Sequence, residues 1–304
     1  MQRFIVLAIV GLFAQLIDGA LGMGYGATSA SLLLTAGIAP AYASATVHMA
    51  EVVTTMASGT AHWRFGNVDR RMTLYLALPG AVGAFAGAVA ISLISSSAAK
   101  PFIAVFLFML GLSILFRFVR TVAEPKPSGL KTKRGFLVPL GLVAGFCDAS
   151  GGGGWGPIAT TSLLSKNDST PRQVIGSVDT SEIAVASSAT LGFLLVLGWE
   201  AINPIWVGAL ILGGVIAAPL AAWLIRVIPT RMLGVLAALT IMLTNARVLV
   251  VSEGLSMSTS TAIYFGIVAF WGVAVSAGRM RRAAYERHTI VERPSGPSEF
   301  ATGD

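Results

Sequence analysis

Long apolar segments separated by short polar ones dominate this chain. A helical segment of about 20 residues is long enough to cross a hydrocarbon core of about 30 Å. The segments lack the strict alternation of apolar and polar residues that marks the strands of a membrane barrel. The pattern therefore predicts an all-α polytopic membrane protein. We interpret its apolar segments as residues 3–21, 24–37, 41–63, 72–95, 101–119, 135–150, 155–165, 172–197, 202–227, 231–250 and 259–278.

Two pairs of these segments, 3–21 with 24–37 and 135–150 with 155–165, are each one long apolar stretch interrupted by glycine. Both pairs carry the same pattern. The first copy reads Asp18-Gly-Ala-Leu-Gly-Met-Gly-Tyr25-Gly, and the second reads Asp148-Ala-Ser-Gly-Gly-Gly-Gly-Trp155-Gly. Glu51 follows Asp18 by 33 residues, and Glu182 follows Asp148 by 34. A duplicated, glycine-broken polar segment in an apolar chain is typical of a transporter built from two structural repeats.

Composition narrows the class of protein further. Of the 304 residues, 55% are hydrophobic and 12% are charged, whereas soluble domains carry about 25% charged residues. The net charge is +7, but the basic residues lie in short runs between apolar segments, which argues against a nucleic-acid partner. The glycine runs lack the lysine and hydroxyl residue of a phosphate-binding loop, which argues against a nucleotide-driven pump. We expect no cofactor.

The basic runs indicate how the chain is threaded, because they favour the cytoplasmic side of a bacterial inner membrane. If each glycine-broken segment returns as a hairpin, every run lies on that side. If each crosses once, the runs of the second half face outward. The hairpin model gives two inverted repeats, each a hairpin plus three spanning helices, and one extra C-terminal helix. Its parts are residues 1–119 (first repeat), 120–134 (basic cytoplasmic linker), 135–250 (second repeat), 251–278 (additional helix) and 279–304 (polar cytoplasmic tail).

On these motifs the chain resembles the sulfite exporter TauE/SafE family of membrane permeases. The resemblance covers about residues 4–250. The motifs that carry it are Gly22-Met-Gly-Tyr-Gly26, the run from Gly151 to Pro157, the small-residue helices after Pro40 and Pro171, and the turn from His62 to Asp69. The resemblance implies transport of small sulfur-containing or organic anions, such as sulfite or sulfonates. The chain departs from the family pattern at Met23 and Tyr25 and in its additional ionisable residues.

The glycine breaks are the candidate substrate site. Glycine allows the backbone to turn and to approach a ligand closely. The half-helix after each break offers free N–H groups and the positive end of its dipole to an anion. The alternative is close helix packing without a ligand. The candidate substrate-binding residues are Gly22, Gly24, Tyr25, Gly26, Thr28, Ser29, Gly152, Gly153, Gly154, Trp155, Gly156, Thr160 and Thr161.

Ionisable residues within apolar segments are the candidate coupling groups, because a charged group in the membrane persists when it lines a pathway or has a partner. His48 and Glu51 share a helix face, as do Asp179 and Glu182, and burial favours the neutral form of a carboxylic acid. The alternative is a structural pair.

Asp18 and Asp148 are structural or gating residues, since aspartate is a good capping residue beside a break. Tyr25 and Trp155 either line the substrate or pack as anchors.

We interpret the chain as a secondary transporter of a small anion that works by alternating access, and not as an enzyme. The stretches 22–29 and 151–161 are expected to meet near the bilayer centre. The partners expected are the lipid bilayer, the anion and a coupling proton or cation, and a homodimer is left open. No metal set is expected, because the three histidines are scattered. The alternatives are a channel-like anion pore, an intramembrane enzyme that uses His48 and Glu51, and a membrane assembly factor.

Overall fold

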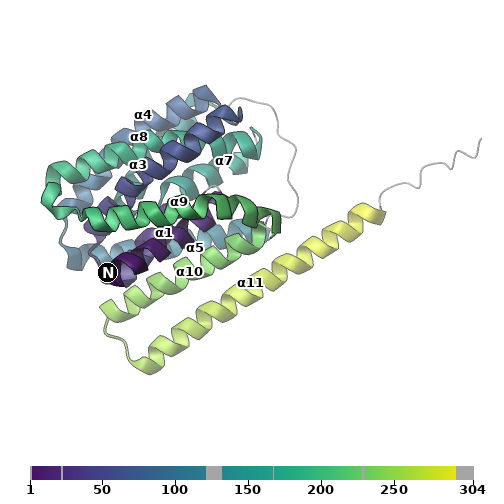
Figure 1. Ribbon diagram of the computed structural model, residues 1–304. Helices are drawn as coiled ribbons and strands as arrows, with labels where there is room; N and C mark the ends of the chain where they lie inside the picture. Colours follow the sequence, from purple (N-terminus) through teal and green to yellow (C-terminus); the bar gives the residue numbers. More distant parts are fainter. Residues whose placement is uncertain (1, 22, 121–131, 167, 228–229, 292–304) are drawn as a thin grey trace, which may run out of the picture.

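The structure, a computed structural model, describes residues 2–21, 23–120, 132–166, 168–227 and 230–291, and regular structure within them is helical (Figure 1). Gly22, most of the expected linker and residues 292–304 of the expected tail lie outside the described residues. The first half holds α1 (Gln2–Leu21), α2 (Tyr25–Thr35), α3 (Pro40–Arg64), α4 (Arg70–Leu93) and α5 (Ser96–Arg120). The second half holds α6 (Arg134–Gly151), the π-helix η1 (Gly156–Thr160), α7 (Thr161–Lys166), α8 (Pro171–Leu197), the short 3₁₀-helix η2 (Trp199–Ala201), α9 (Pro204–Val227) and α10 (Thr230–Ser252). The last helix is α11 (Met257–Val291).

Helix starts follow local sequence signals. Pro40 and Pro171 open α3 and α8, where the fixed φ of proline suits the first turn and its missing N–H costs no hydrogen bond. The Asp69 carboxylate accepts hydrogen bonds from the N–H groups of Arg71 at 2.9 Å and Met72 at 3.1 Å, and so caps α4. The Asp69 N–H donates to Ser177 Oγ at 2.8 Å, which ties this turn to α8.

The prediction of an all-helical membrane protein is confirmed. Within the described residues, five helices are long and apolar enough to cross a membrane: α4, α5, α8, the Gly234–Ser252 part of α10 and the Met257–Ala284 part of α11. Phe4–Asp18 and Pro204–Ala217 are shorter apolar helices. We expected residues 41–63 to span as well, but α3 is not among the five. Its apolar residues are diluted by serine, threonine, His48 and Glu51, and several of its polar side chains between Ser44 and Thr55 are buried.

The two halves pack on each other in reciprocal pairs. Helix α1 of the first half corresponds to α6 of the second, and α4 corresponds to α9. Helix α1 lies mainly against α9, and α6 lies mainly against α4. The counterparts α3 and α8 pack on each other, and so do α5 and α10. The sequence duplication therefore corresponds to a duplication of packing.

Glycine makes the closest of these contacts. A Cβ at Gly145 of α6 would lie 3.0 Å from the Gly80 Cα of α4, and one at Gly141 would lie 2.8 Å from the Leu76 carbonyl oxygen. On the other pair, a Cβ at Gly11 of α1 would lie 2.9 Å from the Leu210 Cα of α9. Small residues let helix backbones approach closely where lipid supplies no hydrophobic driving force between helices.

Helix α11 lies outside this arrangement. It packs on α10 and α5, and its far end extends beyond the other helices (Figure 1). Large apolar side chains on it are exposed, among them Phe265 at 71% and Val273 at 70%, as expected of a helix that faces lipid. The extra helix was expected at 259–278, but it continues to Val291. The helix therefore includes basic residues from Arg279 onward that we had assigned to the tail.

We predict that Gly145→Ala lowers the thermal unfolding temperature of the purified protein. A methyl group at this site must displace the backbone of α4, and overpacking costs about 1–3 kcal/mol. The matched control is Gly208→Ala, because a Cβ at this helical glycine meets nothing within 4 Å. There alanine should be neutral or stabilise the helix by up to about 1 kcal/mol. Equal unfolding temperatures for the two variants would contradict the close packing described for α4 and α6.

Candidate functional site

Each glycine break ends one helix and begins another inside the protein. Helix α1 ends at Leu21 and α2 begins at Tyr25, directly after Gly24, whose φ is +109°. Helix α6 ends at Gly151, and Gly152 follows with φ +77°. These positive φ values favour glycine, because a Cβ clashes there. A π-helical turn opens the second half-helix, and such turns are frequent at functional sites.

The two breaks lie directly against each other. A Cβ at Gly26 would lie 2.7 Å from the Gly152 carbonyl oxygen and 2.8 Å from the Gly153 Cα. A Cβ at Gly153 would overlap the backbone of Gly26 and Ala27. The prediction that the two stretches meet is therefore confirmed for the described residues, which do not include Gly22.

The two aspartates hold the breaks in the same way. Asp18 Oδ1 accepts a hydrogen bond from the N–H of Tyr25 at 3.3 Å. Asp148 Oδ1 accepts one from the N–H of Trp155 at 2.9 Å. Each carboxylate thus spans its break and satisfies an N–H group at the start of the second half-helix, where a negative charge is stabilised by the helix dipole.

A histidine connects the first repeat to the second break. His48 Nδ1 lies 2.8 Å from the Ser44 carbonyl oxygen, and because a carbonyl only accepts, Nδ1 is the donor. His48 Nε2 lies 3.1 Å from Asp148 Oδ2, so a proton lies between these two atoms as well. Ser44 Oγ donates to the Ala149 carbonyl oxygen at 2.6 Å. Both contacts join α3 to the end of α6, and both are buried.

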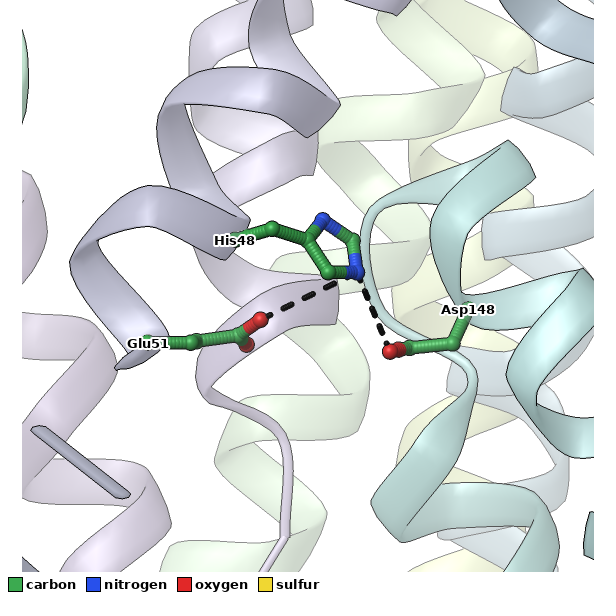
Figure 2. A group of neighbouring side chains, drawn as sticks. All are labelled: His48, Glu51 and Asp148. Atoms are coloured by element: carbon green, nitrogen blue, oxygen red, sulfur yellow. Dashed lines mark hydrogen bonds and ion pairs between the residues drawn. The ribbon is translucent and has the colours of Figure 1, made fainter. Parts of the chain in front are cut away.

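Glu51 completes this group (Figure 2). Its Oε2 lies 4.0 Å from His48 Nε2 and has no hydrogen-bond partner among the described residues, although the side chain is only 2% exposed. A Cβ at Gly26 would lie 2.8 Å from Glu51 Oε1, which places the carboxylate beside the start of α2. Among the described residues, the positively charged partner within 4.0 Å of either carboxylate is His48.

The equivalent pair in the second repeat is built differently. Asp179 occupies the position of His48, and its Oδ1 accepts a hydrogen bond from Ser58 Oγ at 3.0 Å. Its Oδ2 is buried without a partner. Glu182, one turn further along α8, is half-buried. One repeat therefore presents a histidine and an acid, and the other presents two acids.

Within the part of the chain that the structure describes, several hydroxyl groups near the breaks lack hydrogen-bond partners. Thr28 Oγ1 and Ser29 Oγ in α2 are buried and unpaired, and so is Thr160 Oγ1 in the second half-helix. Thr161 is half-buried. Buried polar groups in proteins are usually hydrogen-bonded, so three unpaired hydroxyls next to two helix starts are an unusual concentration of available donors.

The two aromatic residues of the motif pack inside the protein. The Trp155 side chain is fully buried, and its Nε1–H donates to the Val178 carbonyl oxygen at 3.1 Å. The Tyr25 hydroxyl lies 3.5 Å from the Leu210 carbonyl oxygen. The polar end of Trp155 thus contacts α8 of its own repeat, and that of Tyr25 contacts α9 of the other repeat.

Sequence reasoning missed two features of the site. The His48–Asp148 pair joins residues 100 positions apart, and no local spacing indicates it. Arg117 of α5 donates from Nη1 to Met23 Sδ at 2.9 Å, which brings a guanidinium group to the first break.

Comparisons with known proteins give two matches. The model of the family "Sulfite exporter TauE/SafE" matches residues 7–248. The chain is 50% identical over 278 residues to the Bacillus subtilis protein named "Probable membrane transporter protein YtnM". The aligned region covers 90% of this chain and 92% of that protein. The comparison with solved structures found no match.

We predict that Asp148→Ala destabilises the protein more than Asp18→Ala. The first change removes a cap and also leaves the buried His48 Nε2 without its hydrogen-bond partner, which costs about 1–3 kcal/mol beyond the cap. The second removes a cap alone, at about 1 kcal/mol. Thermal unfolding in detergent measures both. Asp148→Asn retains an acceptor for the Trp155 N–H, so its loss of stability should lie between those of the two alanine variants. If the two alanine variants lose the same stability, the His48 contact does not contribute.

Proposed function

Because the chain belongs to the sulfite exporter TauE/SafE family of membrane transporters, we propose that it is a secondary transporter of a small anion, such as sulfite, a sulfonate or another organic anion. The observation that carries this proposal is the contact between two glycine breaks that also bear unpaired, buried hydroxyl groups. It works in a bacterial cell membrane by alternating access.

The anion is bound by backbone and hydroxyl donors at the two breaks. Two half-helices begin there, and each presents N–H groups and the positive end of a helix dipole. The hydroxyls of Thr28, Ser29 and Thr160 add donors that have no acceptor among the described residues. Such a site suits a small oxyanion, because donors from several directions can each meet one oxygen. The remaining residues of the proposed site are Gly24, Tyr25, Gly26, Gly152, Gly153, Gly154, Trp155, Gly156 and Thr161.

Arg117 supports the choice of an anion. Its guanidinium group contacts Met23 within the first break. A positive charge beside the first break makes the local potential more favourable for an anion. This residue was not among those expected from the sequence.

Alternating access uses the reciprocal packing of the two halves. The helix pairs α1–α9 and α6–α4 each combine one helix of the first repeat with one helix of the second. In the proposed mechanism the repeats are inverted in the membrane, so that tilting one pair against the other exposes the breaks to each side in turn.

Coupling is assigned to the acids beside the breaks. We assign a coupling proton to the second repeat, where Asp179 Oδ2 is buried and unpaired and Glu182 is half-buried. A carboxyl group in such surroundings can carry a proton as a neutral acid. We propose the same coupling role for His48 and Glu51, the equivalent pair of the first repeat, in which Glu51 is the second candidate for the proton.

We expect Thr28→Val and Ser29→Ala to weaken anion binding without loss of stability. Each removes a hydroxyl that has no protein partner, so folding loses no hydrogen bond, whereas the anion loses one worth about 1 kcal/mol, or about fivefold in affinity. Sulfite and a panel of sulfonates are titrated against the purified protein by thermal shift, followed by flux in proteoliposomes.

Thr190→Val is the matched control, because its hydroxyl is also buried and unpaired. Thr190 lies beyond Asp179 in α8, towards the end of the helix at Leu197. Unchanged affinity in both break variants would remove these hydroxyls from the site. If no anion of the panel shifts the unfolding temperature or crosses the membrane, the proposed function is wrong.

We expect Glu182→Gln and Asp179→Asn to abolish the stimulation of anion flux by a proton gradient, while anion binding at a fixed pH remains within a few-fold of the wild type. Glutamine and asparagine keep the shape and the hydrogen bonds but cannot exchange a proton. Glu200→Gln is the control, because Glu200 is exposed in η2. Gradient-stimulated flux that persists in both acid variants would refute this coupling. Flux that never saturates with anion concentration would favour a channel-like pore.

A further inference from the structure

We propose that His48, Glu51 and Asp148 form a binding site for a divalent first-row transition-metal ion. One ligand atom from each residue can be chosen so that the three atoms lie within 4.8 Å of one another, and all three side chains are buried. Two of them come from α3 and the third from the end of α6 (Figure 2). The ion would therefore join the first repeat to the second break.

Two of the three side chains are oriented by contacts on their other side. His48 Nδ1–H donates to the Ser44 carbonyl oxygen at 2.8 Å, which leaves Nε2 facing the carboxylates. Asp148 Oδ1 accepts from the Trp155 N–H at 2.9 Å, which leaves Oδ2 facing His48. Metal-binding histidines and carboxylates are usually fixed in this way by hydrogen bonds to their remaining atoms.

Glu51 gives an independent indication of a ligand. It is 98% buried, since only 2% of the residue is exposed, and its Oε2 has no hydrogen-bond partner. That oxygen faces the gap between His48 and Asp148 (Figure 2). A carboxylate oxygen buried without a partner is costly, and a cation between the three groups would satisfy it.

The distances fit a small ion after a minor adjustment. Donors about 2.1 Å from a tetrahedral or octahedral ion lie about 3.0–3.4 Å from each other. His48 Nε2 and Asp148 Oδ2 are 3.1 Å apart, whereas His48 Nε2 and Glu51 Oε2 are 4.0 Å apart. All three ligand atoms lie within 4.8 Å of one another, so a movement of the Glu51 carboxylate by about 1 Å toward the other two would close the site.

The donor set selects the kind of ion. One imidazole nitrogen and two carboxylate oxygens suit zinc, cobalt, manganese or iron, whereas calcium and magnesium prefer oxygen alone. Two carboxylates also balance a divalent charge in surroundings where net charge is costly. The ion would replace the proton that otherwise lies between His48 Nε2 and Asp148 Oδ2, because metal ligands must be deprotonated.

Cobalt binding to the purified, tag-free full chain tests this proposal. The protein is treated with EDTA, exchanged into metal-free buffer in detergent and titrated with Co²⁺, while visible d–d absorption reports an N/O-ligated ion. We expect one Co²⁺ per chain, displaced by equimolar Zn²⁺ but not by excess Mg²⁺ or Ca²⁺. Glu51→Gln should weaken Co²⁺ binding at least tenfold, and His48→Gln should abolish it.

Glu51→Gln is the decisive variant, because it alters a carboxylate oxygen that has no partner and should fold normally, as thermal unfolding in EDTA checks. Glu200→Gln, at an exposed glutamate of η2, is its matched control in the second repeat, and His62→Gln is the control for a histidine outside the cluster. Both should bind Co²⁺ as the wild type does. Absence of saturable Co²⁺ binding, or equal affinity in Glu51→Gln and the wild type, would overturn the proposal.

This site is independent of the proposed substrate. Anion titrations in EDTA test the transporter's substrate without metal, and Co²⁺ titrations without anion test the metal site. Anion binding without Co²⁺ binding refutes only the metal site, and the reverse result refutes only the substrate.

Discussion

The direct contact of two glycine breaks is the constraint on which the rest of this structure depends. The backbones at Gly26 and Gly153 approach so closely that a single methyl group on either would collide with the other break. Because the breaks meet, the helices that lead into them and away from them must converge at the same place. The capping aspartates, the buried hydroxyls and Glu51 of α3 are brought together there as a consequence. Close approach of the main chain, more than any side-chain contact, therefore organises the interior.

The duplicated motif has kept its geometry and lost its chemical symmetry. Asp18 and Asp148 cap equivalent N–H groups, yet only Asp148 has a histidine opposite it. At the position equivalent to His48 stands Asp179, which is paired with a serine hydroxyl instead. Backbone demands are the same in both repeats and preserve the glycines and caps. The ionisable groups meet different neighbours, so they are free to take on different tasks.

The pattern of the sequence was sufficient for the helices and for the meeting of the breaks. Apolar runs near 20 residues predict spanning helices because the bilayer sets their length, and the repeated glycine motif predicted that the two stretches come together. The approach of Asp148 to His48 could not be read from the chain, because it depends on how α6 packs against α3. The end of α11 was also missed, since apolar character stops near residue 278 while helical structure continues to Val291 on charged residues that also favour helix.

The reciprocal pairing of α1 with α9 and α6 with α4 has a consequence for how the protein is made. Helix α1 leaves the ribosome well before its main partner, α9, has been synthesised. Until then, the glycine face of α1 that receives Leu210 has only lipid or an insertion factor beside it. Neither repeat can complete its packing alone, so assembly has to wait for nearly the whole chain, and the many contacts between distant residues would make it slow. The same exchange of helices leaves the finished protein without a seam at which one half could detach from the other.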